Sequence, residues 1–555
     1  MAEFTGEEAR RLEGHFSNTG ANIFVLITPD QVDRGALMSR YSRSSKSMRR
    51  VFLDEFLNNP DRGKKFYERV LMEYGDDSVA ELGMAQVAME GLSNIAAQKI
   101  EDRRIGLSFL EKSSRYVSWD AKSGGRYAYY RGPDIMESRH EKIYEEACDL
   151  SFDTYTYSLP LVKAHLMDAY PIDDFLFRDS GDFADKPFSE LTVEVDIKSA
   201  ERAYRNATNS MALDLLRGLL PASTLTNLGV AGNGRAFEYL ISTLKSSKLH
   251  EERSLGDRLA SELKSTMGPF IRRASEKHGK LLEEYLTELR GASGGLRFDI
   301  APATENRVRL VSYDAQQDAL DTVVAGLLYE NSGNTFEDLH RIVSERMSDQ
   351  QKHDIVRTFA GLRKSRRQRP PRAFELVSYV FDMVNNFGMF RDMHRHRILT
   401  LQRQLLDAKH GFDVPPELED TGCSREFAEC MKRSGEAYEQ MAKTDTARAQ
   451  YVVNFAYRYQ YMMRVNLREL CHLVELRTLP QGHQDYRDTA RRMYEQVCDI
   501  HPTLSQIMKF VDTKIYRMGR IGPEKRTMSK ILEAGGSTGA AGTGAKKERN
   551  LPDAA

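Results

Sequence analysis

Most of the chain carries hydrophobic residues at three- and four-residue spacing, which is typical of amphipathic helices. The clearest helical stretches are residues 36–57, 78–100 and 372–393. Runs that favour strands are fewer and short, at residues 21–27, 126–132 and 308–314. The last helical stretch leads directly into RDMHRHRILTLQ, so we expect this basic segment to begin on a helix. The pattern predicts a mainly helical chain with a few strands.

The two halves of the chain repeat one pattern. In each half, a glutamate lies near the start of an apolar stretch that ends at a basic cluster. Further along each half, an Asn-x-Arg triplet opens an amphipathic helix, at residues 231–244 and again at 464–477. Each half also opens with a short strand followed by a helix. We therefore interpret the chain as two copies of one unit.

Glycine, serine and proline cluster at residues 291–307, which marks the joint between the copies. The first copy carries extra acidic and aromatic sequence, and the C-terminus is rich in glycine and alanine with few apolar residues. The limits that we expect are residues 20–290 for copy one with an insertion near 120–195, 304–530 for copy two, and 535–555 for a disordered tail.

Charge and composition exclude several classes of protein. Lysine and arginine total 80 against 81 aspartate and glutamate, so the chain as a whole is not a basic nucleic-acid binder. No apolar run approaches the roughly 18–20 residues of a membrane helix. The first residues are acidic and polar, unlike a signal peptide, so we expect a cytoplasmic protein without a membrane partner. The five cysteines form no CxxC pair, and we expect free thiols and no metal.

The run Glu111, Ser113, Ser114 and Arg115 is a candidate anion site. Hydroxyl groups and backbone amides in a tight turn can hold a phosphate, and an arginine can bind it through two parallel hydrogen bonds. The simpler alternative is a helix end with a serine cap and a surface Glu–Arg pair.

A second candidate site is the triplet Arg395, His396 and Arg397, whose side chains can bind anionic or aromatic groups. His394 and His396 are two residues apart, which places them on opposite sides of a helix and disfavours a shared metal. The plainer interpretation is a solvated basic face. The basic run at 363–372 is either a nucleic-acid patch or a basic loop, and the neutral surroundings do not favour nucleic acid.

Together these motifs resemble the flavin-dependent thymidylate synthase family, whose hallmark is R-H-R-x-x-S-x-N-E-x-S-x-R with an N-x-R helix downstream. Copy two holds the first part of the hallmark at 395–397 and the helix with Asn466, Arg468, His472 and Arg477. Copy one holds the second part at 111–115. The resemblance implies an α+β fold of two domains, each a small antiparallel sheet with several long helices, packed as an internal pseudo-dimer.

Active sites of that family lie between subunits, so the resemblance implies one composite site between the two copies. Copy one would supply Arg217, which matches the family's phosphate-binding arginine, and copy two would supply the imide-binding Arg477. The reciprocal site would be inactive, because Leu244 and Gln450 stand where those two arginines should be.

The function implied is methylation of dUMP to dTMP with methylene-tetrahydrofolate, FAD and NADPH. The catalytic residue expected is Arg477, and the residues expected to bind substrate are Glu111, Ser113, Ser114, Arg115, Arg217 and Arg395. The residues expected to bind FAD are Arg395, His396, Arg397, Asn466, Arg468, His472, Ser78 and Glu81.

Two departures from the family keep other functions open. Asp392 stands where the family has a glutamine that holds the pyrimidine, and Arg372 stands where it has a serine or threonine near the flavin. The alternatives are a catalytically degenerate relative that binds a flavin or nucleotide, and a helical nucleic-acid-binding protein. Because family members are tetramers, the resemblance also implies a homodimer of this chain, equivalent to a pseudo-tetramer.

Overall fold

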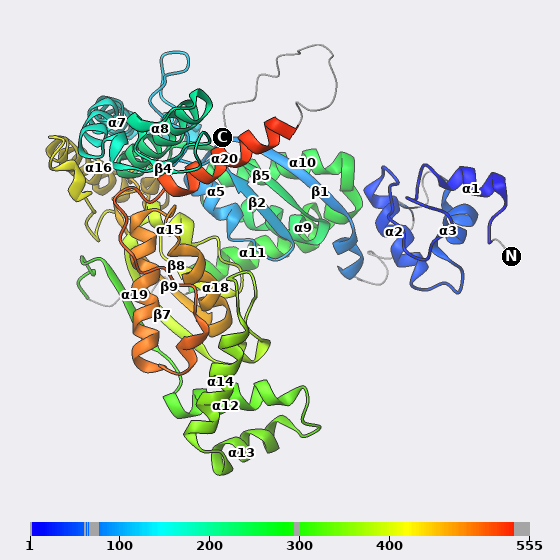
Figure 1. Ribbon diagram of the computed structural model, residues 1–555. Helices are drawn as coiled ribbons and strands as arrows, with labels where there is room; N and C mark the ends of the chain where they lie inside the picture. The colour runs from blue at the N-terminus through cyan, green and yellow to red at the C-terminus, as the bar shows by residue number, and fades with distance from the viewer. Residues whose placement is uncertain (1–2, 60–62, 64, 66–76, 293–299, 538–555) are drawn as a thin grey trace. The chain divides into compact units, whose positions relative to one another are not determined.

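The computed structural model describes all residues except 1–2, 60–62, 64, 66–76, 293–299 and 538–555. The chain forms two compact units, coloured along the chain in Figure 1. Unit 1 comprises residues 1–112, 130–138 and 225–300, and unit 2 comprises 113–129, 139–224 and 301–555. Much of the first half therefore packs with the second half. The domain limits expected from the sequence stay a prediction.

Unit 1 is built on a three-stranded antiparallel sheet in the order β1-β5-β2. The strands are β1 (Met84–Ser93), β2 (Leu107–Glu111) and β5 (Leu225–Asn233). Helices α5, α9 and α10 pack around the sheet (Figure 1) and share its hydrophobic core. The helices of this unit are α1 (Gly6–Leu12), α2 (Gln31–Tyr41), α3 (Met48–Val51), α5 (Asn94–Glu101), α6 (Pro133–Met136), α9 (Gly234–Lys245), α10 (His250–Ile271) and α11 (Lys277–Ala292).

Unit 2 contains a four-stranded antiparallel sheet in the order β6-β7-β9-β8. Its strands are β6 (Arg307–Ser312), β7 (Ser378–Asn386), β8 (Leu399–Arg403) and β9 (Arg458–Asn466), with a separate pair β3 (Phe177–Arg178) and β4 (Asp185–Lys186). Its helices are α7 (Glu141–Ala169), α8 (Glu194–Leu216), α12 (Gln316–Tyr329), α13 (Phe336–Arg346), α14 (Asp349–Leu362), α15 (Phe387–Met393), α16 (Ser424–Ala442), α17 (Thr446–Ala449), α18 (Leu467–Arg477), α19 (Gln484–Ile500) and α20 (Ile521–Ser537).

The two main sheets share one plan, as the repeated sequence pattern predicts. In unit 1, β1 and β5 each lead into a helix whose first turn is capped by the last residue of the strand, Ser93 or Asn233. In unit 2, β7 and β9 do the same with Asn386 and Asn466. Each cap side chain accepts a hydrogen bond from a backbone N–H of the first helical turn, which fixes where the helix begins. The expected α+β class with small antiparallel sheets is confirmed.

Two of the predicted helices are wrong in their central part, where the chain forms a strand, whereas their last residues are helical in α5 and α15. Residues 84–93 form β1, and 378–386 form β7. In β7, Tyr379, Phe381 and Met383 are fully buried on one face. The apolar residues in these stretches fit both the 3.6-residue period of a helix and the 2-residue period of a strand. Antiparallel pairing with β5 and β9 makes them strands.

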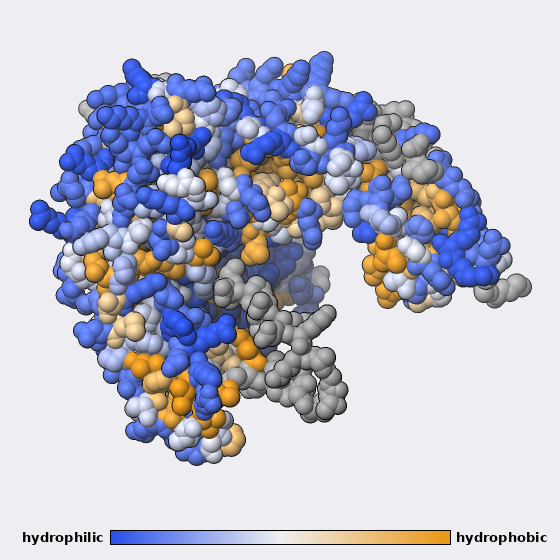
Figure 2. Space-filling model, turned by 90° about the horizontal axis from the view of Figure 1, so that it is seen from above, coloured by the Kyte–Doolittle hydropathy of each residue, from blue (hydrophilic) through white to orange (hydrophobic). Residues whose placement is uncertain are grey.

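Four smaller expectations, at residues 36–57, 21–27, 126–132 and 535–537, also need correction. The stretch 36–57 is broken into α2, α3 and a π-helix at Phe52–Phe56. The stretch 21–27 has only an isolated bridge, between Leu26 and Phe16, and its alternate residues Ile23, Val25 and Ile27 are exposed. The surface in view in Figure 2 is largely hydrophilic, with hydrophobic residues in separate patches.

At the C-terminus, helix α20 continues to Ser537, so residues 535–537 are helical. The rest of the predicted tail lies outside the described residues. The predicted strand at 126–132 has only isolated bridges, of Arg126 with Ser123 and of Tyr129 with Thr224.

The basic run 363–372 is attached to helix α18 by a buried ion pair. Arg363 bonds both carboxylate oxygens of Glu475, at 2.8 and 2.7 Å, and its Nε donates to the Gln368 carbonyl. Arg468 donates to the Pro370 carbonyl at 2.7 Å. The segment is therefore a loop held at both ends against α18, and not an independent basic arm.

Replacement of Arg363 by methionine should lower the free energy of unfolding by about 3–5 kcal/mol, because Glu475 would remain buried without a counter-charge. The matched control is Arg367→Met in the same loop, where the side chain is exposed and the change should stay within about 0.5 kcal/mol. Urea denaturation of both variants measures the difference. Equal losses would show that the pair does not hold the loop.

Candidate functional site

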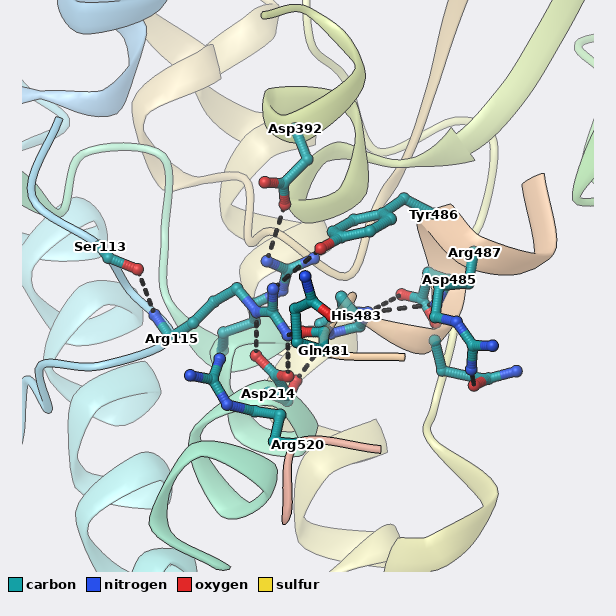
Figure 3. A network of polar contacts seen from close by, with 12 residues as sticks. Ser113, Arg115, Asp214, Asp392, Gln481, His483, Asp485, Tyr486, Arg487 and Arg520 are labelled. Carbon is teal, nitrogen blue, oxygen red and sulfur yellow. Dashed lines mark hydrogen bonds and ion pairs between the residues drawn. The ribbon is translucent and has the colours of Figure 1, made fainter. Parts of the chain in front are cut away.

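A group of ion pairs in unit 2 joins segments that are far apart in the sequence (Figure 3). Arg115 binds Asp214 of α8 through two parallel bonds, Nε to Oδ1 and Nη2 to Oδ2, both 2.7 Å long. The same guanidinium donates to the Tyr486 hydroxyl at 2.9 Å and to the Gln481 carbonyl at 3.1 Å. Arg115 thus connects a loop of the first half to the start of α19.

Local geometry explains how Arg115 is presented. The chain leaves β2 and turns at residues 113–116, where the backbone N–H of Arg115 donates to the Ser113 hydroxyl at 3.2 Å. This is the tight turn that the sequence predicts. Ser114 is buried in the same turn, and its hydroxyl accepts a hydrogen bond from Arg391 at 3.3 Å.

Asp392 on α15 is the second carboxylate of the group. One oxygen lies 3.3 Å from Arg217 Nη1, and the other lies 3.9 Å from Arg477 Nη1. Burial by itself raises the pKa of Asp392, but the charges of Arg217, Arg395, Arg477 and Arg115 outweigh it and hold the pKa well below its usual range. The carboxylate is therefore ionised, and it partly neutralises the arginines around it.

Tyr486 lies between the two arginines that sequence analysis assigned to opposite ends of the substrate. The Cζ atom of Arg115 is 5.6 Å and that of Arg477 is 5.4 Å from the centre of its ring. Cations at this distance are attracted to the electron-rich face of an aromatic ring. The Arg477 side chain is 12% exposed, and its partial burial lowers its pKa.

The loop before α19 is held by its own polar contacts. His483 caps α19, accepting a hydrogen bond from the backbone N–H of Asp485 at Nδ1, and its Nε2 lies 3.2 Å from the Asp214 carbonyl. Arg487 donates to the carbonyls of Thr478 and Lys514, at 3.0 and 2.8 Å. The contacts of His483 and Arg487 thus hold the backbone before and after Tyr486.

The triplet 395–397 is not helical, which corrects the expectation from sequence. Helix α15 ends at Met393, and the triplet lies in the turn before β8. Arg395 and Arg397 are exposed whereas His396 between them is buried. His396 accepts a hydrogen bond from Arg477 Nε at 3.0 Å and contacts Glu469.

The residues of the N-x-R helix have structural partners. Asn466 caps α18 through its side chain, which accepts a hydrogen bond from the Glu469 backbone at 2.9 Å. Arg468 pairs with Glu375 at 2.9 Å. Unit 1 contains the matching pair, Arg235 with Glu81 at 2.7 Å. His472 is half-buried, and burial together with nearby arginines lowers its pKa, so its ring is neutral at physiological pH.

The remaining expected site residues belong to unit 1. Glu111 ends β2 and is buried. Glu81 and Ser78 lie in a 3-10 helix at Asp77–Leu82, where Glu81 is exposed. Unit 2 contains the others, which are Ser113, Ser114, Arg115, Arg217, Arg395, His396, Arg397, Asn466, Arg468, His472 and Arg477. The roles assigned to all these residues stay predictions.

Comparison with known families is consistent with this arrangement. The family model described as thymidylate synthase complementing protein matches residues 26–267 and 309–503, which is more than half of the chain and includes both copies. The chain belongs to the thymidylate synthase complementing protein family. The two matched segments agree with a duplicated domain.

Two curated relatives match this chain over nearly their whole length. A UPF0159 protein of Thermoplasma acidophilum is 40% identical over 512 residues, covering 91% of this chain and 100% of that protein. A UPF0159 protein of Chlamydia pneumoniae is 36% identical over 549 residues, covering 94% and 98%. A solved UMP/dUMP methylase, PolB from Streptomyces cacaoi bound with 5-Br dUMP, matches with 17% identity and a TM-score of 0.30, over 38% of this chain and 98% of that one. This last likeness is too weak to support an inference.

Sequence analysis missed four residues of the candidate site: Asp214, His483, Tyr486 and Arg520. Asp214 and Tyr486 lie on amphipathic helices where a polar residue carries no special spacing. Arg520 lies beyond the family match, stacks over Tyr116 at 4.4 Å and pairs with Glu524 at 3.2 Å. Only the folded chain brings these side chains to Arg115 (Figure 3).

His396, Glu469 and His472 form a cluster whose ligand atoms all lie within 4.8 Å of one another, a geometry that could hold a metal ion. The sequence analysis considered only His394 with His396 and did not find this cluster. That the protein uses no metal stays a prediction. Among the described residues, no helix is long and apolar enough to cross a membrane.

Replacement of Asp392 by asparagine should lower the free energy of unfolding by about 3–5 kcal/mol, because Arg217 and Arg477 lose their shared buried counter-ion. Because folding lowers the pKa of Asp392, this contribution is complete above the unfolded pKa near ~4. It disappears as pH falls through the folded pKa, so the difference between the two proteins should be full at neutral pH and shrink below about pH 4.

Denaturation at several pH values measures this difference, with the exposed Asp420→Asn as the control. Inorganic phosphate should stabilise the Asp392→Asn variant more than the native chain, since a bound anion can replace the lost carboxylate. No difference in the phosphate effect would show that the arginines do not form an anion site.

Proposed function

We propose that this chain methylates dUMP to dTMP, using methylene-tetrahydrofolate as the carbon donor and FAD as the electron carrier reduced by NADPH. The observation that carries the proposal is the convergence of Arg115, Arg217 and Arg477 on Asp392 and Tyr486 in one unit. These arginines come from both copies of the repeat. Membership in the thymidylate synthase complementing protein family supports the same reaction.

The phosphate of dUMP would bind at Arg217 and Arg115. Arg217 is 3% exposed, and its Nη2 is a buried donor without a hydrogen-bond partner in the described part of the chain. An unpaired buried donor is costly, and a phosphate oxygen would satisfy it. Arg115 is already bonded to Asp214, so it contributes mainly as a fixed positive charge with the Ser113 turn beside it.

The uracil ring would lie against Arg477. A guanidinium next to the ring imide favours the ionised imide by direct charge attraction, which makes the ring electron-rich at the carbon to be methylated. Asp392 competes for this guanidinium in the absence of ligand. Binding of an anionic ring would therefore replace one negative partner of Arg477 by another, in a site already organised for negative charge.

The residues around the triplet 395–397 fit a flavin dinucleotide in the chemistry of their donors. The exposed Arg395 and Arg397 can bind phosphate oxygens, and His472 with Arg468 offers further donors beside them. When bound, the flavin supplies the electrons that convert a methylene group to a methyl group. The protein's own residues would hold the flavin and the nucleotide together and exclude water from between them.

One observation favours the second candidate, a catalytically degenerate relative that binds a flavin or nucleotide. Asp392 occupies the position of the family's pyrimidine-binding glutamine, and it is bonded to Arg217 rather than open to a base. A carboxylate only accepts hydrogen bonds, so it cannot replace both functions of an amide. The two candidates differ in turnover, and they share nucleotide binding.

The homodimer and the cytoplasmic location inferred from the resemblance stay predictions, and so does the composite nature of the site across the two copies. Leu244 and Gln450, which should leave the reciprocal site without arginines, are both buried. The Gln450 amide bonds the backbone of Leu406 and Ala447. These two residues therefore serve packing in their own units.

Replacement of Arg217 by glutamine should weaken dUMP binding by about 10- to 150-fold, which corresponds to the loss of one charged hydrogen bond worth about 1.5–3 kcal/mol. The control is Arg202→Gln, an exposed arginine on α8, which should bind dUMP like the native chain. Titration calorimetry at fixed salt measures both. Unchanged affinity in the Arg217 variant would place the phosphate elsewhere.

The purified chain reconstituted with FAD should have a flavin absorbance spectrum and should oxidise NADPH faster when dUMP is present. Formation of dTMP with methylene-tetrahydrofolate, followed by chromatography, completes the assay. A protein that binds FAD and dUMP without forming dTMP would be the degenerate relative. A protein that retains no flavin would contradict the first candidate, and a protein that binds neither flavin nor dUMP would contradict both.

A further inference from the structure

Three side chains in unit 2 form a continuous hydrogen-bonded chain that leads to Arg477. Glu469 Oε1 lies 3.0 Å from His396 Nδ1, and His396 Nε2 lies 3.0 Å from Arg477 Nε. Glu469 and Arg477 belong to the same helix, α18, whereas His396 comes from the turn after α15. The histidine thus connects the two ends of α18 through a second element.

The chemistry of the three groups determines where the protons lie. Arginine is always protonated in proteins, so Arg477 Nε–H can only donate, and His396 Nε2 must present a lone pair. A neutral imidazole with a lone pair at Nε2 carries its hydrogen at Nδ1. That hydrogen donates to the Glu469 carboxylate, which is the acceptor on the other side of the ring. Glu469 therefore selects the tautomer of His396 that can hold Arg477.

Glu469 is placed for this task by the start of its helix. It is the third residue of α18, whose cap is Asn466. A glutamate at this position commonly turns back to the backbone N–H of the cap residue. Here the side chain turns to His396 instead. Glu469 therefore contacts His396 of another element and does not form the usual hydrogen bond with the backbone of the cap residue.

Arg477 is restrained on three sides when this chain is intact. His396 accepts from its Nε, Asp392 attracts its Nη1, and the Tyr486 ring covers its face. A guanidinium held in this way loses little freedom when it binds a planar partner, so the binding costs less conformational entropy. Without His396, Nε would lose its hydrogen-bond acceptor, and only the contacts with Asp392 and Tyr486 would restrain the guanidinium.

A metal ion is the competing explanation for the approach of His396, Glu469 and His472. The charges nearby oppose a cation: Arg369 and Arg468 act on Glu469, and Arg366, Arg369 and Arg477 act on His472. Both ring nitrogens of His396 are already bonded. The bonding and the positive surroundings favour a proton-ordered chain over a metal site.

We propose that Glu469 is a positioning residue, which sets the tautomer of His396 and thereby the orientation of Arg477 toward the nucleotide ring. The role in nucleotide binding rests on the proposed function, whereas the hydrogen-bonded chain itself does not. Burial raises the pKa of Glu469 to about 7, against the opposing charges of Arg369 and Arg468. The carboxylate that holds His396 is therefore present above neutral pH and is lost as pH falls through 7.

This placement has a cost that distinguishes it from a structural role. Because folding raises the pKa of Glu469 above its unfolded value near ~4.3, the buried charge destabilises the protein at pH values above the folded pKa. A Glu469→Gln variant should therefore unfold at the same or a higher temperature than the native chain at pH 8. A residue that served only to stabilise α18 would give the opposite result.

The first experiment is ¹⁵N NMR of histidine-labelled full-length protein at pH 8, with His396 assigned by the loss of its signals in His396→Gln. We expect a hydrogen at Nδ1 and none at Nε2 in the native chain, and altered ring signals in Glu469→Gln. A hydrogen at Nε2 of native His396 would overturn the proposal. So would metal bound in stoichiometric amount, shown by elemental analysis of the purified protein and lost in Glu469→Gln. This experiment needs no substrate.

The second experiment measures dUMP binding by calorimetry between pH 6 and 8.5. Native affinity should fall as pH drops through about 7, and Glu469→Leu should weaken binding at pH 8 by about tenfold, the equivalent of one neutral hydrogen bond. Its matched control is Glu426→Leu, an exposed glutamate at the same third position of α16, which should retain native affinity and pH profile. Equal profiles in native and Glu469→Leu protein would overturn the role in binding. If native protein fails to bind dUMP at all, the proposed function is wrong, and the NMR result still decides whether Glu469 orders His396.

Discussion

The structure of the candidate site depends on one constraint: several arginines share a small buried space and need buried carboxylates to do so. Asp392 serves Arg217 and Arg477, and Asp214 serves Arg115. Guanidinium groups that approach one another in a low-dielectric interior repel strongly unless negative charge lies between them. The internal counter-ions show where negative charge is stable in this space, which is the property that the proposed binding of a nucleotide phosphate requires. In a site of this kind an anionic ligand would replace a carboxylate as the partner of an arginine, so the number of buried unpaired charges would not rise.

Duplication explains why one chain can hold such a site from two unlike halves. Both units keep a strand that runs into an asparagine-capped helix, and both keep the Arg–Glu pair behind it, Arg235 with Glu81 and Arg468 with Glu375. The side chains late in the two helices differ, since Leu244 of α9 is packed in a hydrophobic core whereas Arg477 of α18 is part of a polar network. The residues that maintain the fold of the repeat are thus different from those of the candidate site. Each copy can lose some of the latter and still fold.

Family and duplication could be inferred from the sequence because short motifs carried them. The triplet at 395–397, the run 111–115 and the Asn-x-Arg helices are local patterns, and a local pattern survives without knowledge of the fold. Secondary structure was less reliable in the two stretches before the capped helices. In residues 84–93 and 378–386 the spacing of the apolar residues fits both a helix and a strand. Antiparallel pairing with β5 and β9 makes both segments strands.

The sequence by itself determined the α+β class, the repeat and most of the arginines of the candidate site. Only the tertiary structure decided which groups neutralise those arginines. Asp214, Tyr486 and Glu469 lie on helices where their spacing is unremarkable, and each becomes informative through a partner far away in the chain: Arg115, Arg477 or His396. The physical reason is that a motif records which donors a ligand needs, whereas the balance of buried charge is a property of side chains that meet only after folding.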